Sequence, residues 1–184
     1  MNSEKNARVD VLFTERSPVR MSEQEQEGSY CASGYLYLGQ LTYRQGEDEL
    51  KLEVQTGGWM NEDSPFKRAG LCPLQPVWGE YDPQLYPDTA FPALEAETTL
   101  GTLCTGKRQG FRVPDPPGTG RSALMVHASS RRGSEGCIST PRNEQWLLFC
   151  KHMEQLHAQG IESIPLRVAY ACPPPEHQRC LARE

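Results

Sequence analysis

The chain of 184 residues lacks any apolar run close to the roughly 18 residues that a membrane-spanning helix needs. Its first residues also lack the apolar segment of a secretory signal. A basic excess is missing as well, because 24 acidic residues outnumber 19 basic ones and the formal net charge is −5. We therefore expect no membrane insertion, no nucleic-acid partner, and synthesis in the cytoplasm without a signal peptide.

Long stretches of helical periodicity are also scarce, whereas fifteen prolines and sixteen glycines indicate many turns and loops. Cysteine is abundant, with seven residues in a chain of modest size. Setting Cys137 aside leaves six, which permits up to three disulfides in an oxidising compartment and leaves their pairing open. Cys150 lies on the apolar face of a predicted helix, so we expect it to be a buried thiol.

The composition divides the chain into two parts. Residues 1–28 are polar and charged and are predicted to form a flexible N-terminal arm, in which only 9–13 is expected to be ordered. Residues 29–184 are predicted to form a single catalytic domain. Within it, residues 59–98 form a loop rich in proline and aromatic residues, which is either a groove wall or an irregular surface segment packed by its own rings.

Alternating apolar residues predict short strands, the first two of which are joined by a tight hairpin at Gly39-Gln40. The chain after Asn143 has the apolar spacing of a helix, which ends at Gly160. The fold class is therefore mainly β with one principal helix, a β-rich α+β fold that begins with an antiparallel sheet. The predicted strands span 35–38, 41–43, 50–54, 99–104, 110–113, 122–126 and 164–170, and the predicted helix spans 143–159.

The strongest chemical signal is a histidine followed ten residues later by a cysteine in a turn flanked by glycines. His127 ends an apolar run, and Cys137 follows Gly136. A thiol becomes a good nucleophile when a nearby imidazole removes its proton. Glycine permits tight turns that aim backbone N–H groups of Gly136 and Cys137 at a developing oxyanion. The pattern predicts a cysteine acyl-transfer enzyme.

Other residues near this motif are candidates for supporting roles. Ser134, or a backbone carbonyl, is expected to orient the imidazole. Arg121 and Arg131 border the motif and can bind a substrate carboxylate through paired hydrogen bonds, and Trp78 of the aromatic loop is a further substrate-binding candidate. The spacing of the remaining histidines does not fit a metal pair on one helix face, so we expect no metal and no cofactor.

The segments Gly120-Arg-Ser-Ala-Leu-Met-Val-His127 and Ser134-Glu-Gly-Cys-Ile138 resemble the motif of the L,D-transpeptidase (YkuD-like) superfamily. They are most similar to its divergent branch of type VI secretion effectors that target peptidoglycan. The resemblance covers about residues 118–150, with Glu135 where the usual signature has a second histidine. It implies an antiparallel β-sandwich or barrel with a helix after the catalytic cysteine.

The resemblance also implies an activity. Cys137 would attack the carbonyl of the L,D bond in a tetrapeptide stem of peptidoglycan and release the terminal D-alanine, with His127 as the base. Water would complete an L,D-carboxypeptidase reaction, and a D-amino acid would give exchange. The protein would be an antibacterial toxin, secreted into the periplasm of a target cell, with a secretion apparatus and a cognate immunity protein as partners.

Two other functions remain open from the residues alone. One is a different cysteine amidase or endopeptidase of peptidoglycan, although such enzymes usually place the cysteine before the histidine. The other is a non-catalytic interaction module, in which the segment around Cys137 is a structural turn.

Overall fold

The computed structural model describes residues 6–18, 30–61, 93, 95–102, 110–115, 124–130 and 134–172. They form one eight-stranded sheet in the order β4-β8-β1-β2-β3-β7-β6-β5, and a helix, α3, follows Cys137. The predicted β-rich α+β fold with a principal helix is therefore confirmed. The elements are β1 Arg8–Pro18, β2 Tyr30–Gln45, β3 Asp48–Asn61, β4 Ala96–Gly101, β5 Gly110–Arg112, β6 Met125–Ala128, β7 Ser134–Thr140, α3 Glu144–Ala158 and β8 Ser163–Tyr170.

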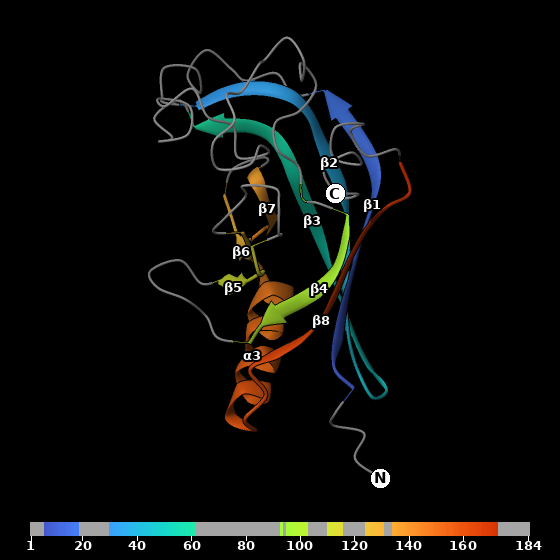
Figure 1. Ribbon diagram of the computed structural model, residues 1–184, viewed down its shortest axis with the longest axis vertical. Helices are drawn as coiled ribbons and strands as arrows, with labels where there is room; N and C mark the ends of the chain where they lie inside the picture. Colours follow the sequence, from blue (N-terminus) through green and yellow to red (C-terminus); the bar gives the residue numbers. More distant parts are fainter. Residues whose placement is uncertain are drawn as a thin grey trace.

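The sheet is mixed rather than antiparallel throughout. The long strands β1, β2 and β3 lie side by side and run antiparallel, as Figure 1 shows. However, β8 pairs with β1 in parallel, and β7 pairs with β6 in parallel. The prediction of an antiparallel sheet is wrong at these two places. β1 and β8 come from opposite ends of the described chain, so no hairpin sets their direction, and β6 and β7 follow each other in the chain but do not form a hairpin.

The two edge strands of the sheet approach each other. A Cβ atom added at Gly101 of β4 would lie 3.4 Å from the backbone oxygen of Arg112 of β5. The sheet therefore curls until its edges nearly meet, and its concave side becomes the interior of the domain. No helix in the described part of the chain is long and apolar enough to cross a membrane.

Helix α3 fills this interior at one end. The side chain of Asn143 caps it by accepting a hydrogen bond of 3.0 Å from the Trp146 N–H. The ring of Phe149 contacts both Tyr43 of β2 and Phe111 of β5, with centroids 5.9 and 5.3 Å apart. The helix therefore packs against strands from both halves of the sheet. Its predicted apolar face is confirmed as Trp146, Phe149, Cys150, Met153 and Leu156.

The predicted hairpin at Gly39-Gln40 is wrong. Gly39 lies in the middle of β2, and the turn to β3 instead contains Gly46, whose φ of 61° suits a tight turn. Gly39 is opposite an irregularity in β1, where Phe13 pairs with it and Glu15 pairs with Leu38. A Cβ atom at Gly39 would lie 2.1 Å from the Leu12 carbonyl oxygen. This glycine therefore serves a close approach of two strands, not a turn.

Residues 9–13, the piece of the arm expected to be ordered, lie in β1, but this strand is longer than expected, and the predicted flexible arm is wrong for Arg8 and for residues 14–18, which also belong to β1 inside the sheet. Val9, Val11 and Phe13 alternate toward the core and are almost completely buried, so β1 supplies the interior that β2 and β8 need. The predicted loop 59–98 is shorter at both ends, because β3 continues through Asn61 and β4 begins at Ala96. Its residues 62–92 lie outside the described residues.

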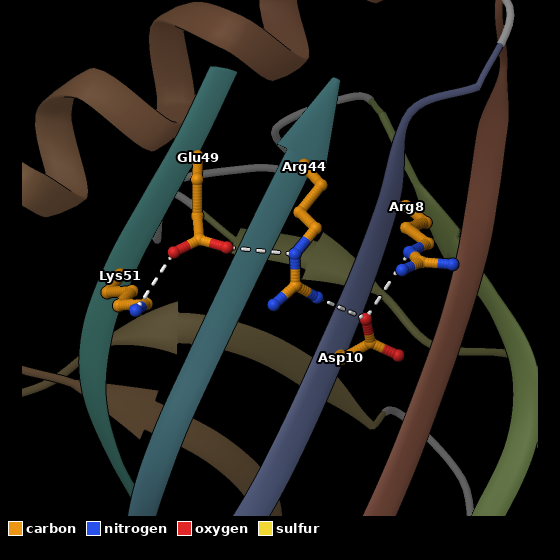
Figure 2. A network of polar contacts seen from close by, with 5 residues as sticks. All are labelled: Arg8, Asp10, Arg44, Glu49 and Lys51. Carbon is orange, nitrogen blue, oxygen red and sulfur yellow. Dashed lines mark hydrogen bonds and ion pairs between the residues drawn. The ribbon is translucent and has the colours of Figure 1, made fainter. Parts of the chain in front are cut away.

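The outer face of β1, β2 and β3 carries a row of alternating charges (Figure 2). Arg44 contacts Asp10 at 2.8 Å and Glu49 at 2.9 Å, while Arg8 and Lys51 extend the row at its two ends. Hydrogen bonds from Lys51 and Arg44 lower the pKa of Glu49 below its ordinary value. These exposed pairs link three neighbouring strands on the side of the sheet that faces solvent.

Candidate functional site

His127 and Cys137 lie on neighbouring parallel strands. His127 of β6 is paired with Ser139 of β7, and Cys137 is two residues before Ser139 on the same strand. Side chains two residues apart on a strand point to the same face, so Cys137 and His127 share a face. In a regular parallel pair, such an offset of two residues corresponds to about 8 Å between Cα atoms. Two residues that are ten positions apart in the sequence therefore lie on adjacent strands.

The face they share is the one opposite the core. Val126 and Ile138, which precede and follow these residues on the two strands, are paired with each other and belong to the hydrophobic core. His127 and Cys137 are each half-buried. Both residues are therefore held by buried neighbours and remain partly accessible.

The imidazole of His127 has a defined hydrogen bond. Its Nδ1 lies 2.9 Å from the carbonyl oxygen of Ala128, the next residue. A carbonyl only accepts hydrogen bonds, so this contact requires the proton on Nδ1 and leaves Nε2 of the neutral ring unprotonated. A backbone carbonyl thus orients the ring, which is one of the two arrangements predicted from the sequence.

Cys137 was predicted in a turn, but it lies inside strand β7. The strand is strongly irregular there. Gln55 of β3 pairs with Ser139, while Gly57 and Gly58 both pair with Ser134. Thr56 alone is therefore opposite residues 135–138, a bulge in β7. Gly136 lies in this bulge with a φ of 105°, a backbone conformation that favours glycine.

The carbonyl of Cys137 is held by two hydroxyl groups. Thr56 Oγ1 donates to it at 2.9 Å, and Ser134 Oγ donates to it as well. Thr56 and Ser134 are both buried, and their hydroxyl oxygens are 3.5 Å apart. Both lone pairs of the carbonyl oxygen are therefore used, and side chains hold a backbone group that a regular ladder would have paired.

This pair of hydroxyls connects to a longer chain of hydrogen bonds. The N–H of Ala93 donates to Thr56 Oγ1 at 2.8 Å, and the hydroxyl of Tyr170 on β8 donates to the Ala93 carbonyl at 2.5 Å. Tyr170 is itself packed on Phe13 and Tyr37, with ring centroids 4.9 and 5.2 Å away. These hydrogen bonds therefore link the backbone at Cys137 to the aromatic core around Tyr170.

The other predicted site residues have different outcomes. Ser134 lies close to Cys137, and its hydroxyl donates to the Cys137 carbonyl; the group that orients the imidazole is the Ala128 carbonyl. Gly136 adjoins the cysteine as expected. Arg121, Arg131 and Trp78 lie outside the described residues, so their predicted substrate-binding roles stay predictions.

Two further cysteines provide a contrast with Cys137. Cys150 is buried on α3, as predicted, and Cys172 follows β8. The Cys172 thiol donates to the Phe13 carbonyl at 3.7 Å, and burial raises its pKa above the ordinary value. All three are thiols in the structure. A raised pKa makes Cys172 a poorer nucleophile near neutral pH.

Thr56 is the residue of this site that sequence reasoning missed. It marks the end of the predicted strand 50–54 and precedes Gly57-Gly58, but nothing local relates it to a cysteine 81 residues later. In the sequence, Thr56 stood out only as a polar residue followed by two glycines, which did not indicate a contact with Cys137. That contact depends on the pairing of β3 with β7.

The arrangement therefore consists of a half-buried thiol in a bulged segment of β7 and a half-buried imidazole on the neighbouring strand β6. The resemblance of residues 118–150 to the L,D-transpeptidase superfamily stays a prediction. Comparison with known protein families, with curated proteins and with solved structures finds no match to this chain.

Proposed function

We propose that this protein is a cysteine acyltransferase that acts on tetrapeptide stems of peptidoglycan as an L,D-carboxypeptidase and L,D-transpeptidase. The observation that supports the proposal is the strand register, in which His127 of β6 pairs with Ser139, two residues after Cys137 on β7. The motif around these residues supplies the substrate class by resemblance, and we assign Cys137 as the nucleophile and His127 as its base.

The reaction begins with proton transfer from the Cys137 thiol to Nε2 of His127. The sulfur then attacks the carbonyl carbon of the L,D bond that precedes the terminal D-alanine. A C–S bond forms, the oxyanion is stabilised by backbone N–H groups of Gly136 and Cys137, and the C–N bond then breaks. The imidazolium gives its proton to the departing amine, which leaves as D-alanine. The product is a thioester on Cys137.

The thioester is resolved by an acceptor. Water gives a tripeptide stem and completes a carboxypeptidase reaction. A D-amino acid attacks through its amine and gives an exchanged tetrapeptide. In both cases His127 Nε2 takes a proton from the acceptor and returns it to the sulfur, so the enzyme is regenerated without a cofactor.

The direct test incubates the reduced protein with purified disaccharide tetrapeptide, with and without an added D-amino acid, and follows the masses of the products. We expect loss of one D-alanine in water and mass exchange with the D-amino acid. Cys137→Ala should abolish both. Cys172→Ala is the matched control, because it removes a half-buried thiol elsewhere and should leave turnover unchanged.

Two results would overturn the proposal. One is a tetrapeptide that stays intact with the reduced wild-type protein. The other is cleavage at a different bond of the stem, which would favour a cysteine amidase or endopeptidase instead. Turnover that survives Cys137→Ala would exclude the assigned nucleophile.

The biological setting is part of the same proposal. Removal of D-alanine destroys the stems that donate cross-links, so the activity would be toxic in the periplasm of a bacterium. Expression directed to the periplasm of a bacterial host should stop growth, whereas cytoplasmic expression should not. Periplasmic Cys137→Ala should be harmless at the same protein level. Equal toxicity of the wild type and this variant would contradict the toxin assignment.

A further inference from the structure

We infer that Thr56 is a positioning residue for Cys137, an inference that rests on the proposed function. Thr56 comes from β3, a strand that contributes no residue of the sequence motif. Its side chain is completely buried, and its hydroxyl donates to the Cys137 carbonyl in the bulge of β7 at 2.9 Å.

The direction of the Thr56 proton follows from its partners. The Ala93 N–H can only donate, so Thr56 Oγ1 accepts at that contact of 2.8 Å. The single hydroxyl proton is then available for the Cys137 carbonyl at 2.9 Å. Because Ala93 is in turn fixed by Tyr170, the Thr56 hydroxyl is oriented before any substrate arrives.

Holding this carbonyl fixes the backbone at Cys137 and with it the direction of the Cα–Cβ bond that carries the thiol. The peptide group between Cys137 and Ile138 is planar, so a fixed oxygen fixes the torsion that joins the Cys137 Cα atom to this plane. Ile138 is anchored on the other side by its pairing with Val126 of β6. The Cα–Cβ bond of Cys137 is thereby aimed relative to His127. Residues 135–138 have only Thr56 opposite them on β3. The Thr56 hydroxyl therefore holds the Cys137 carbonyl in place of the backbone hydrogen bond that regular strand pairing would provide.

Ser134 is the second donor to the same carbonyl, but it cannot replace Thr56. Ser134 belongs to β7 itself, at the start of the bulge, so the hydrogen bond from its hydroxyl joins two residues of the same strand. Thr56 belongs to a long strand that is paired along most of its length with β2. It therefore relates the cysteine to the rigid part of the sheet.

The test uses three variants. Thr56→Val keeps the shape and removes the hydroxyl, and Thr56→Ser keeps the hydroxyl. Thr102→Val is the matched control, because Thr102 is also completely buried and donates to a backbone carbonyl, that of Ile161, at 2.6 Å. Each is measured for kcat and KM with the disaccharide tetrapeptide, for thermal unfolding, and for the rate of iodoacetamide labelling at Cys137.

We expect Thr56→Val to lower kcat by about 10- to 100-fold with KM nearly unchanged, because a displaced nucleophile loses its alignment with the bound substrate. Labelling of Cys137 at pH 6.5 should slow as well. Thr56→Ser should stay within about threefold of the wild type. Thr102→Val should lose similar thermal stability and keep its kcat.

Unchanged kcat and labelling in Thr56→Val would overturn the inference, as would an equal loss of kcat in Thr102→Val at matched stability. If the wild type cleaves no tetrapeptide, the proposed function fails and labelling alone decides the role of Thr56. Slower labelling in Thr56→Val than in Thr102→Val then supports positioning, and equal rates refute it.

Discussion

The sheet is irregular at two glycines, Gly39 in β2 and Gly136 in β7, and the surroundings of the two differ. At Gly39 the opposite strand closes in with its own backbone, and the Leu12 carbonyl occupies the space of a side chain. At Gly136 the regular pairing with the opposite strand is interrupted, and the hydroxyls of Thr56 and Ser134 donate hydrogen bonds to the Cys137 carbonyl. The first irregularity packs the sheet, whereas the second presents a thiol.

The contrast teaches that a bulge is not by itself a sign of function. Both are long-range features of strand pairing, and both depend on glycine. The irregularity at Gly136 differs in its neighbouring residues. It contains a cysteine, and the adjacent strand carries a histidine whose Nδ1 is hydrogen-bonded to a backbone carbonyl. The row of charges in Figure 2 is a third region of the same sheet, and its five residues include no cysteine and no histidine.

The largest expected effect is that of Gly39→Ala on stability. Its Cβ atom would lie 2.1 Å from the Leu12 oxygen and 2.7 Å from the Phe13 Cα atom, so β1 and β2 would have to separate. We expect a loss of about 3 kcal/mol or more in the free energy of unfolding by urea. Gly101→Ala is the control, because its nearest neighbour would be at 3.4 Å. Equal stability of the two variants would contradict the packing role of Gly39.

Gly136→Ala should separate stability from activity. A φ of 105° is strained for alanine, and we expect a loss of about 1 to 3 kcal/mol in unfolding free energy. Turnover of the tetrapeptide should fall much further than the folded fraction does. Gly160→Ala, at a φ of 81° with open space around it, is the control for positive φ outside the site. It should lose stability without losing turnover; retained turnover in Gly136→Ala would show that the bulge does not present the thiol.

The smallest effect is expected in the charge row. Asp10→Asn breaks exposed contacts with Arg8 and Arg44 and should cost less than about 1 kcal/mol, and less still in high salt. Turnover should not change. A large or salt-independent loss of stability would mean that these pairs support the sheet more than exposed pairs usually do.

Glu49 in the same row should show a pH effect of known sign. Hydrogen bonds from Lys51 and Arg44 depress its pKa in the folded state. Its contribution is therefore present above the ordinary carboxyl pKa and is lost as the pH falls through the folded-state value. The difference in Tm between the wild type and Glu49→Gln should shrink in acid. A constant difference would contradict this.

The sequence predicted those elements whose signals are local. Asn143 as cap, Gly160 as end and the apolar spacing between them defined α3 almost to the residue. The alternation of 9–13 was visible too, but its place in the centre of the sheet was not, because its partners β2 and β8 are distant in the chain. Gly39 was misread as a turn for the same reason.

The candidate site divides in the same way. His127 and Cys137 were predicted as a pair from their residue types and spacing, and they lie on neighbouring strands, although the turn predicted around Cys137 is a bulged strand. A backbone carbonyl was one of the two groups predicted to orient His127, and Ala128 supplies it. Thr56 was out of reach, because its contact with Cys137 exists only once β3 and β7 are paired.

The most direct test of the central claim compares the labelling rates of individual thiols in the folded, reduced protein. Iodoacetamide at pH 6.5, with the modified peptides quantified by mass spectrometry, should label Cys137 faster than Cys172, whose pKa is raised, and than buried Cys150. His127→Ala should remove this advantage, whereas His157→Ala on the exposed side of α3 should not. If Cys137 labels no faster than Cys172, or if His127→Ala changes nothing, His127 and Cys137 do not act as base and nucleophile.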